Sequence, residues 1–276
     1  MRSSATAVWD VVRPQRPIPV PGVGMVGFRD RGVSATPQRA IAHPSLTLAV
    51  DFGAGRLIVT DASGRQLRGS VAAGLGFGPG PLWVGGEHFE AVQVRLPPAL
   101  ARPLLGVRPA DLTGAPVSLD DLWGRSAARL REQLAGAASW AERFSLVAEQ
   151  LASRLRAAAP GTQPAGEIAW AWGRVQAGGG RVRIDELAAE LGWSRKRLWS
   201  RFQEQIGLPP KRAARLVRFD HAVHRLVAGQ DIARVAADCG YADQSHLHRE
   251  VVEFTGETPT AAPRKPWLAV DATAWT

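Results

Sequence analysis

The chain has 276 residues, of which 45% are hydrophobic and 21% are charged. This composition excludes a largely disordered chain, and at roughly 150 residues per domain the length predicts two domains. Lysine and arginine number 34 against 25 acidic residues, so the net charge of +9 favours a polyanionic partner.

The single cysteine, Cys239, excludes an internal disulfide framework and a cysteine-based zinc cluster. The N-terminal region carries Pro14, Pro17, Pro19 and Pro21 where a signal peptide would need an apolar helix. No stretch approaches the roughly 20 apolar residues of a membrane span. We therefore expect a soluble cytoplasmic protein without a membrane partner.

The N-terminal part of the chain has the pattern of a β-rich domain. Residues 1–40 are rich in Gly, Pro and Arg and predict loops with an early strand. Strand-like runs follow at 46–50, 56–60 and 89–96, and glycines are dense between 74 and 86. Short strands separated by glycines favour a sandwich or a barrel.

Helical patterns begin after Pro97 and Pro98. Ser118 and Ser139 are each placed to cap a helix with an apolar stripe. The segment 160–164 breaks the chain and predicts a domain boundary, and a further helix then ends at the glycines 178–180.

The C-terminal part contains an internal repeat. The segment 184–193 is matched position for position by 232–241, 48 residues later. The residues that follow also match, because Leu198, Phe202, Gly207 and Pro210 have the same spacings of 4, 5 and 3 as Leu247, Val251, Gly256 and Pro259. Each copy therefore predicts a short helix, a glycine turn and a longer helix, which is the helix-turn-helix pattern.

Counting 100° per residue assigns the faces of the two longer helices. Ser194 and Asp243 are placed to cap them, and apolar stripes that include Phe202 and Val251 should be buried. The opposite faces and flanks of the N-terminal halves could enter a major groove. We predict DNA contacts from eight residues: Lys196, Trp199, Ser200 and Arg201 in the first motif, and Gln244, Ser245, His248 and Arg249 in the second.

Positive charge is concentrated around the first motif. Residues 194–218 hold eight cations and one acid, Glu204. The pattern predicts a basic patch that binds phosphates, formed by Arg195, Lys196, Arg197, Arg201, Lys211, Arg212, Arg215 and Arg218.

The tandem motif resembles the AraC family of bacterial transcription regulators over about residues 165–262. The closest match is Asp231–Glu250, followed by Phe254–Pro259. The resemblance implies a long connecting helix, here Pro210–Val227, that holds two recognition helices about one DNA turn apart. It also implies an N-terminal cupin-like domain for effector binding or dimerisation. The family often has Arg at the place of Ser200, whereas here the next residue is Arg.

Other chemistry-bearing residues have simpler interpretations. The glycine pattern 22–27 lacks the flanking strand and helix of a nucleotide site. His43 and His88, with Glu87 or Glu90, lack the spacing of a metal site, so we expect no cofactor and no metal. A solvated face is expected for His221 and His224, a buried position for Cys239, and a core role for Trp83, Trp123, Trp140, Trp170 and Trp172. Trp199 could pack on a neighbouring helix or lie against a sugar or a thymine methyl.

The fold class that we predict is α+β and multidomain. A β-rich, cupin-like domain with trailing helices occupies residues 1–160, an all-α double helix-turn-helix domain occupies 165–263, and 264–276 form a tail. The predicted function is a sequence-specific transcription regulator that reads two adjacent major grooves of double-stranded DNA. A small-molecule effector, RNA polymerase and a second copy of the chain are the further partners that we consider.

Two alternatives stay open at this point. The first is a small-molecule enzyme or sensor on the β domain with an accessory helical domain. An enzyme would need an acid/base or metal constellation, and since none is found by spacing we expect no enzymatic activity. The second is a non-specific DNA-coating protein, which would bind with a salt dependence but without sequence preference.

Overall fold

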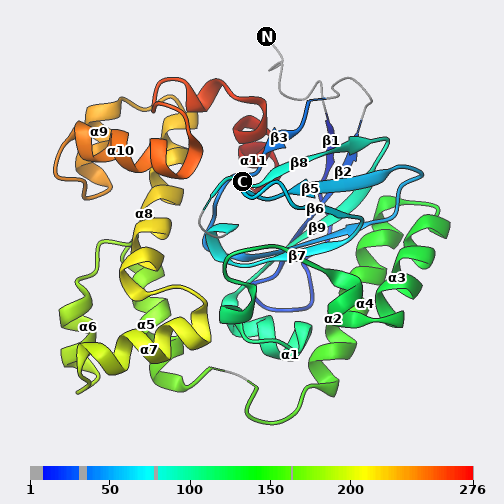
Figure 1. The fold of residues 1–276 in the computed structure, drawn as a ribbon, viewed down its shortest axis with the longest axis horizontal. Coiled ribbons are helices and arrows are strands. Elements are labelled where there is room, and N and C mark those ends of the chain that lie inside the picture. Colours follow the sequence, from blue (N-terminus) through cyan, green and yellow to red (C-terminus); the bar gives the residue numbers. More distant parts are fainter. Residues whose placement is uncertain (1–8, 31–35, 78–79, 163, 276) are drawn as a thin grey trace.

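The computed structural model describes residues 9–30, 36–77, 80–162 and 164–275. Two antiparallel sheets pack face to face, with helices beside them, and an all-helical unit follows (Figure 1). This arrangement confirms the predicted α+β class, with a β-rich N-terminal part and a helical C-terminal part. The finer cupin-like resemblance, the domain boundaries and the part of the 1–40 segment outside these ranges stay predictions.

The six-stranded sheet has β9 (Glu90–Leu96) near its centre, and its order is β1 (Trp9–Val12), β2 (Gly24–Asp30), β9, β4 (Leu46–Asp51), β7 (Val71–Ala73), β10 (Val117–Ser118). The four-stranded sheet has the order β3 (Gln38–Arg39), β8 (Trp83–Glu87), β5 (Arg56–Thr60), β6 (Gln66–Arg68). The three strand-like runs predicted from the sequence correspond to β4, β5 and β9.

Alternation along β9 and β4 gives the larger sheet two different faces. One face carries fully buried aliphatic side chains such as Val92 and Leu48. The other face, which includes Thr47, Gln93 and Arg95, lines a cavity between the sheets. The cavity exists because the inward-facing positions of the central strands do not carry large apolar side chains.

The glycine pattern at 22–27 runs from a turn at Gly22 into β2, where aromatic rings approach the backbone. A Cβ on Gly24 would lie 2.8 Å from the ring of Trp275, and one on Gly27 would lie 2.4 Å from the ring of Trp140. These two glycines are therefore explained by packing, as the absence of nucleotide-site flanks predicts.

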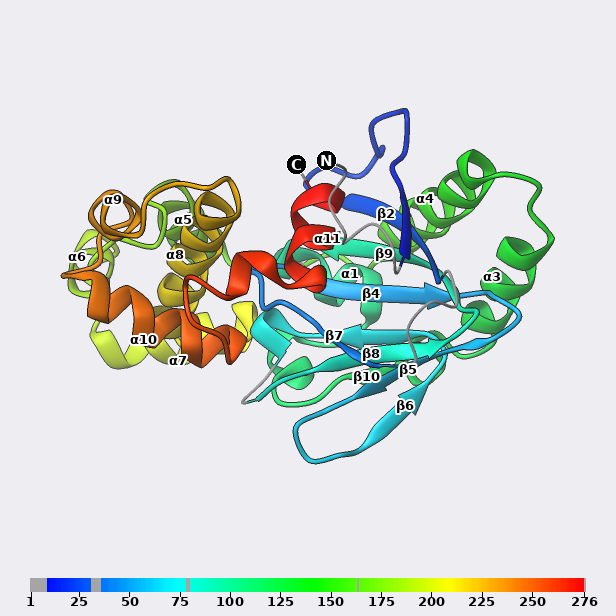
Figure 2. The ribbon, with the colours of Figure 1, turned by 90° about the horizontal axis from the view of Figure 1, so that it is seen from above.

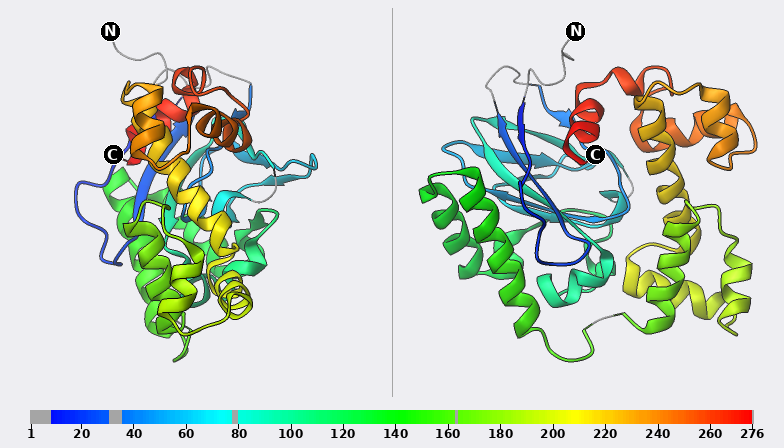
Figure 3. Two further views of the ribbon diagram at one scale, coloured as in Figure 1. Left: turned by 90° about the vertical axis from the view of Figure 1, so that its left-hand side faces the viewer. Right: turned by 180° about the vertical axis from the view of Figure 1, so that it is seen from behind.

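Helices cover the β region and continue toward the C-terminal unit (Figure 3). Ser118 caps α2 (Leu119–Trp123) and Ser139 caps α4 (Trp140–Ala157), as predicted. The first predicted helix is divided in two, because Gly124 has φ of 54°. The covering helices are η3 (Pro98–Leu100), α1 (Ala101–Leu105), η4 (Pro109–Leu112), α2 (Leu119–Trp123), α3 (Arg125–Gly136) and α4 (Trp140–Ala157).

The C-terminal helices follow the repeat closely. They are α5 (Gly166–Ala177), α6 (Ile184–Glu190), α7 (Arg195–Ile206), α8 (Pro210–Val227), α9 (Ile232–Asp238) and α10 (Gln244–Thr255). A last helix, α11 (Pro266–Trp275), occupies the segment that the sequence presents as a tail, and it lies against β1, β2 and β3 (Figure 1). In the ranges that the structure describes, no helix combines the length and apolarity needed to cross a membrane.

The predicted aromatic core is partly wrong. Trp123 and Trp172 are buried, but Trp83 and Trp170 are 39% and 37% exposed. Trp83 lies on the outer face of β8, and the Arg174 guanidinium stacks on Trp170 at 5.4 Å. Cys239 is buried, as predicted.

Candidate nucleic-acid interface

The two longer helices of the repeat begin at side-chain caps. The Ser194 hydroxyl accepts a hydrogen bond from the backbone N–H of Arg197 at 3.2 Å, and the Asp243 carboxylate accepts one from that of His246 at 2.6 Å. Both predicted caps are confirmed. Each cap fixes where the helix starts and leaves its first turn at the surface.

Buried stripes fix the rotation of α7 and α10. Leu198, Phe202 and Ile206 are at most 1% exposed, and Leu247 and Val251 are fully buried. Only Phe254 departs from the prediction, because it is half-buried and stacks on Phe219 with ring centroids 4.6 Å apart. The faces opposite these stripes are consequently turned to solvent.

Three positions on the exposed faces are equivalent in the two helices. The repeat pairs Lys196 with Ser245, Trp199 with His248, and Ser200 with Arg249, and all six are exposed. The side chain of Trp199 is 52% exposed, so packing inside the protein does not account for it. Gln244, the first residue of α10, is exposed beside them.

Arg201 is the one predicted contact residue that the structure does not group with the others. Its equivalent in the second motif, Glu250, is only 1% exposed, whereas the side chain of Arg201 itself is 57% exposed, so burial does not exclude it from a DNA contact. Arg201 pairs with Glu204 at 3.4 Å and lines a surface hollow together with Pro109 of η4. One further step of 100° beyond Ser200 therefore turns this side chain toward the β region.

The connecting helix α8 sets the distance between the two motifs. It has 18 residues and is therefore about 27 Å long at 1.5 Å per residue. Figure 2 shows α7 and α10 on the same side of α8. One turn of B-DNA measures about 34 Å, which is of the same order as the length of α8.

A buried ion network holds α10 on α8. The carboxylate of Glu250 accepts from Arg215 at 2.8 Å, from Arg218 at 3.0 Å and from the Tyr241 hydroxyl at 2.9 Å. Burial by itself would raise the pKa of Glu250, but hydrogen bonds from Arg218 and Arg215 outweigh it and lower that pKa. The carboxylate is therefore charged at neutral pH.

This network corrects the predicted basic patch. Arg215 and Arg218 neutralise Glu250 and are structural, so they are not free for phosphate. Arg195 pairs with Asp185 at 2.7 Å. Lys196, Arg197 and Lys211 remain exposed, and Arg197 stacks on Trp193 at 4.3 Å.

A family model described as a helix-turn-helix domain matches residues 187–265, which contain both motifs except the first turn of α6. The C-terminal part of the chain is an AraC-type helix-turn-helix domain. The chain is accordingly a DNA-binding transcription regulator that carries an AraC-type helix-turn-helix domain in its C-terminal part.

Solved structures of ToxT from Vibrio cholerae have the same overall fold as this chain. A single-substitution variant of ToxT in its apo form aligns with 10% identity and a TM-score of 0.52, over 91% of this chain and 98% of that one. A structure of ToxT at 1.65 Å resolution aligns with 12% identity and a TM-score of 0.50. A third structure, bound to (E)-4-(8-methylnaphthalen-1-yl)but-3-enoic acid, aligns with 11% identity and a TM-score of 0.50. Each of these two alignments covers 90% of this chain and 98% of the ToxT chain. No curated protein matches the chain.

The helices α7 and α10 of this regulator both end against its β region. The Thr113 hydroxyl donates to the carbonyl of Gly207 at 2.6 Å, directly after α7. The Arg39 guanidinium donates to the carbonyl of Phe254 at 3.3 Å, near the end of α10. The N-terminal turns of α7 and α10 point away from the β region (Figure 1).

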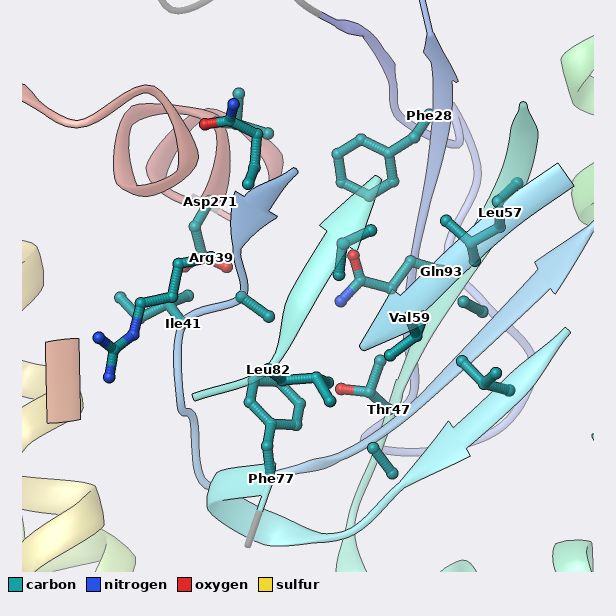
Figure 4. Close-up of a pocket in the computed structure, with 18 of the residues that line it drawn as sticks. Phe28, Arg39, Ile41, Thr47, Leu57, Val59, Phe77, Leu82, Gln93 and Asp271 are labelled. Carbon is teal, nitrogen blue, oxygen red and sulfur yellow. The ribbon is translucent and has the colours of Figure 1, made fainter. Parts of the chain in front are cut away.

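The β region encloses a cavity of about 120 Å³ between its two sheets. Figure 4 shows Phe28, Val59, Phe77 and Leu82 around this space. Gln93 points into it from β9. His43, also in the lining, is buried and bonds the Thr47 hydroxyl at 2.9 Å, and this burial keeps the pKa of His43 well below its usual value.

An ionic cluster joins one end of the cavity to the DNA-binding domain. Arg95 of β9 pairs with Asp271 of α11, and the other Asp271 oxygen accepts from His224 Nε2 of α8 at 3.2 Å. His224 Nδ1 donates to the carbonyl of Asp220 at 2.7 Å. His221 is exposed, as expected, but the solvated position expected for His224 is wrong, because α11 covers that face of α8.

The contact between His224 and Asp271 should weaken as the pH rises. The hydrogen bond to Asp271 raises the pKa of His224 to about 9, and the charge of Asp220 adds to this, although burial opposes it. A raised folded-state pKa stabilises the fold fully below pH 6.5, and this stabilisation is lost as the pH rises through 9.

Urea unfolding of the full chain from pH 6 to pH 10 tests this. The stability of the native chain is expected to fall over that range, and Asp271→Asn should remove most of the fall. Equal slopes for the two proteins would assign the pH dependence to other groups.

Proposed function

We propose that this regulator reads two successive major grooves on one side of double-stranded DNA with the N-terminal halves of α7 and α10. One observation carries the proposal. Two capped, exposed helix faces with three equivalent positions lie on the same side of an 18-residue helix. The seven residues that we propose as contacts are Lys196, Trp199, Ser200, Gln244, Ser245, His248 and Arg249.

The proposed contacts divide by their chemistry. Arg249 can donate two hydrogen bonds to guanine O6 and N7, and Gln244 can bond adenine in the same bidentate way. Trp199 offers an apolar face to a thymine methyl or a sugar. Lys196 and the free N–H groups of the first helical turns are suited to phosphates, which position the protein without reading sequence.

Recovery of bound genomic fragments tests this function. The full chain is incubated with fragmented genomic DNA of the source organism at moderate salt, and the retained DNA is sequenced. We expect a motif with two half-sites about 10 bp apart. Retention without a motif would favour the non-specific alternative, and no retention would overturn the proposal.

We also propose that the cavity between the sheets binds a small effector. Its mostly apolar lining with a few polar groups is typical of ligand sites. A ToxT structure of the same fold contains a bound small organic acid. Contacts with RNA polymerase and with a second copy of the chain stay predictions.

A further inference from the structure

We propose that the cavity between the sheets takes a neutral molecule the size of one aromatic ring, held by a hydrogen bond from His43 to a hydroxyl or carbonyl oxygen of the ligand. This inference rests on the proposed effector role of the cavity. It adds the size, the charge and the polar group of the effector, and each of these follows from a different observation.

The volume of the cavity sets the size of the ligand. The enclosed space is about 120 Å³, and an apolar protein cavity of about 150 Å³ holds one benzene molecule. The walls are aliphatic and aromatic, with Phe28, Leu57 and Phe77 among them. A single ring therefore fills this space, whereas a long hydrocarbon chain exceeds it.

The charged groups in the lining already have partners. Arg95 and Asp271 pair with each other, and their side chains are only 13% and 8% exposed. Arg39 also contributes to the lining, but its guanidinium donates to the Phe254 carbonyl and turns away from the cavity (Figure 4). An ionic ligand would bring a further charge into this space or break the pair of Arg95 and Asp271, and both are costly. A neutral ligand leaves the pair intact.

His43 supplies the polar group that the ligand meets. The residue lines the cavity and is 2% exposed, and within the described residues its Nδ1 has no hydrogen-bond partner. Its Nε2 lies 2.9 Å from the Thr47 hydroxyl. When this hydroxyl donates to Nε2, the ring carries its proton on Nδ1. A buried N–H without an acceptor is unfavourable, so an oxygen of the ligand completes the hydrogen bonding of the ring.

The charge state of His43 suits a neutral oxygen. Burial, together with the charges of Arg95 and His224, holds the pKa of His43 well below its usual value. The ring is therefore uncharged at neutral pH. An uncharged donor does not compensate a carboxylate for the loss of its hydration, whereas it matches a hydroxyl or a carbonyl.

Gln93 offers a second polar contact. Its side-chain amide points into the cavity from β9 (Figure 4), and no hydrogen bond of this amide is found in the part of the chain that the structure describes. An amide both donates and accepts, so it can bond a hydroxyl of the ligand in either direction. An aromatic ring with a hydroxyl group combines the required size with these two contacts, and phenol is the simplest such molecule.

NMR titrations of ligand signals with the full chain test the class of ligand. Phenol should bind about tenfold more tightly than toluene, which has the same shape without the oxygen, because it gains one hydrogen bond. Benzamide should bind at least about tenfold more tightly than benzoate, its charged match, since the cavity holds no unpaired cation for the carboxylate. Equal binding of phenol and toluene, or tighter binding of benzoate than of benzamide, would overturn the proposed class and leave the effector role. No binding of any of the four would overturn both.

Variants assign the hydrogen bond to His43. His43→Leu should reduce phenol binding to the level of toluene, and retained toluene binding would show that the cavity is intact. His221→Leu is the matched control, because His221 is an exposed histidine of α8 outside the lining, and it should bind phenol as the native chain does. An unchanged preference for phenol in His43→Leu would overturn the role of His43.

Nitrogen NMR of the histidine rings provides a test on the native chain. Phenol should shift the Nδ1 signal of His43, whereas toluene should leave it in place, and equal shifts with both would overturn the hydrogen bond. None of these experiments contains DNA. A failure here with a recovered DNA motif would concern the effector alone, whereas the expected binding without a DNA motif would concern the proposed reading of DNA.

Discussion

Glu250→Ala is expected to destabilise the C-terminal unit by about 3–5 kcal/mol. The substitution leaves Arg218, which is 14% exposed, and part of Arg215 without their buried counter-charge. It also removes the acceptor of the Tyr241 hydroxyl. Since these groups hold α10 on α8, thermal unfolding followed by circular dichroism should show the loss, and binding to a two-half-site DNA should fall with it.

Glu253→Ala is the matched control for this substitution. Glu253 lies one turn further along α10, also pairs with Arg215, and is 56% exposed. Its removal should cost at most about 1 kcal/mol, because solvent screens an exposed pair. Similar losses for Glu250→Ala and Glu253→Ala would show that the buried network does not hold α10 in place.

Arg249→Ala is expected to weaken binding to the selected DNA by about 1–3 kcal/mol, or roughly 5- to 150-fold in Kd. Arg249 is exposed and has no structural role in the described residues. The expected loss is therefore that of its bidentate contact with a base. Preference should be lost at one or two positions of a single half-site and kept in the other. Fluorescence anisotropy with a set of single-base variants of the site measures both effects.

Arg129→Ala controls for the loss of positive charge. Arg129 is an exposed residue of α3 in the β region, far along the chain from both motifs. Its replacement should leave affinity and sequence preference unchanged at moderate salt. Unchanged affinity and preference for Arg249→Ala as well would exclude α10 as the second recognition helix.

The parts of the fold that sequence could predict are those with a local signal. Caps at Ser194 and Asp243 and the buried stripe around Phe202 follow from short-range spacing, whereas the bounds of α8 were implied by the family resemblance. The repeat also relates Arg201 to Glu250, but the two environments differ, because Glu250 is buried against two arginines of the connecting helix whereas Arg201 is 57% exposed. The equivalence of Arg201 and Glu250 is visible only when the two motifs are aligned with each other.

The parts that sequence could not predict depend on contacts between distant segments. Nothing near Asp271 in the sequence indicates that it meets Arg95, 176 residues away, or His224. The basic patch is smaller than predicted for the same reason, since a count of charges in 194–218 does not include Glu250, which pairs with Arg215 and Arg218. The seven proposed contact residues still require measurement with DNA.

The ends of α7 and α10 have a consequence for the lengths of DNA that this regulator can accept. Both helices terminate on one β framework, at Gly207 and near Gly256, and one straight helix joins them. Inserting a single base pair between half-sites shifts one of them by about 3.4 Å and rotates it by about 36°. Two DNA-binding motifs joined by a flexible linker could adjust to that change. Here α7 and α10 are both attached to the β region, so the same adjustment would break the contact of Thr113 or that of Arg39. The regulator should therefore accept only a narrow range of half-site spacings. Removing the contact of Thr113 or that of Arg39 with the helix ends should broaden this range.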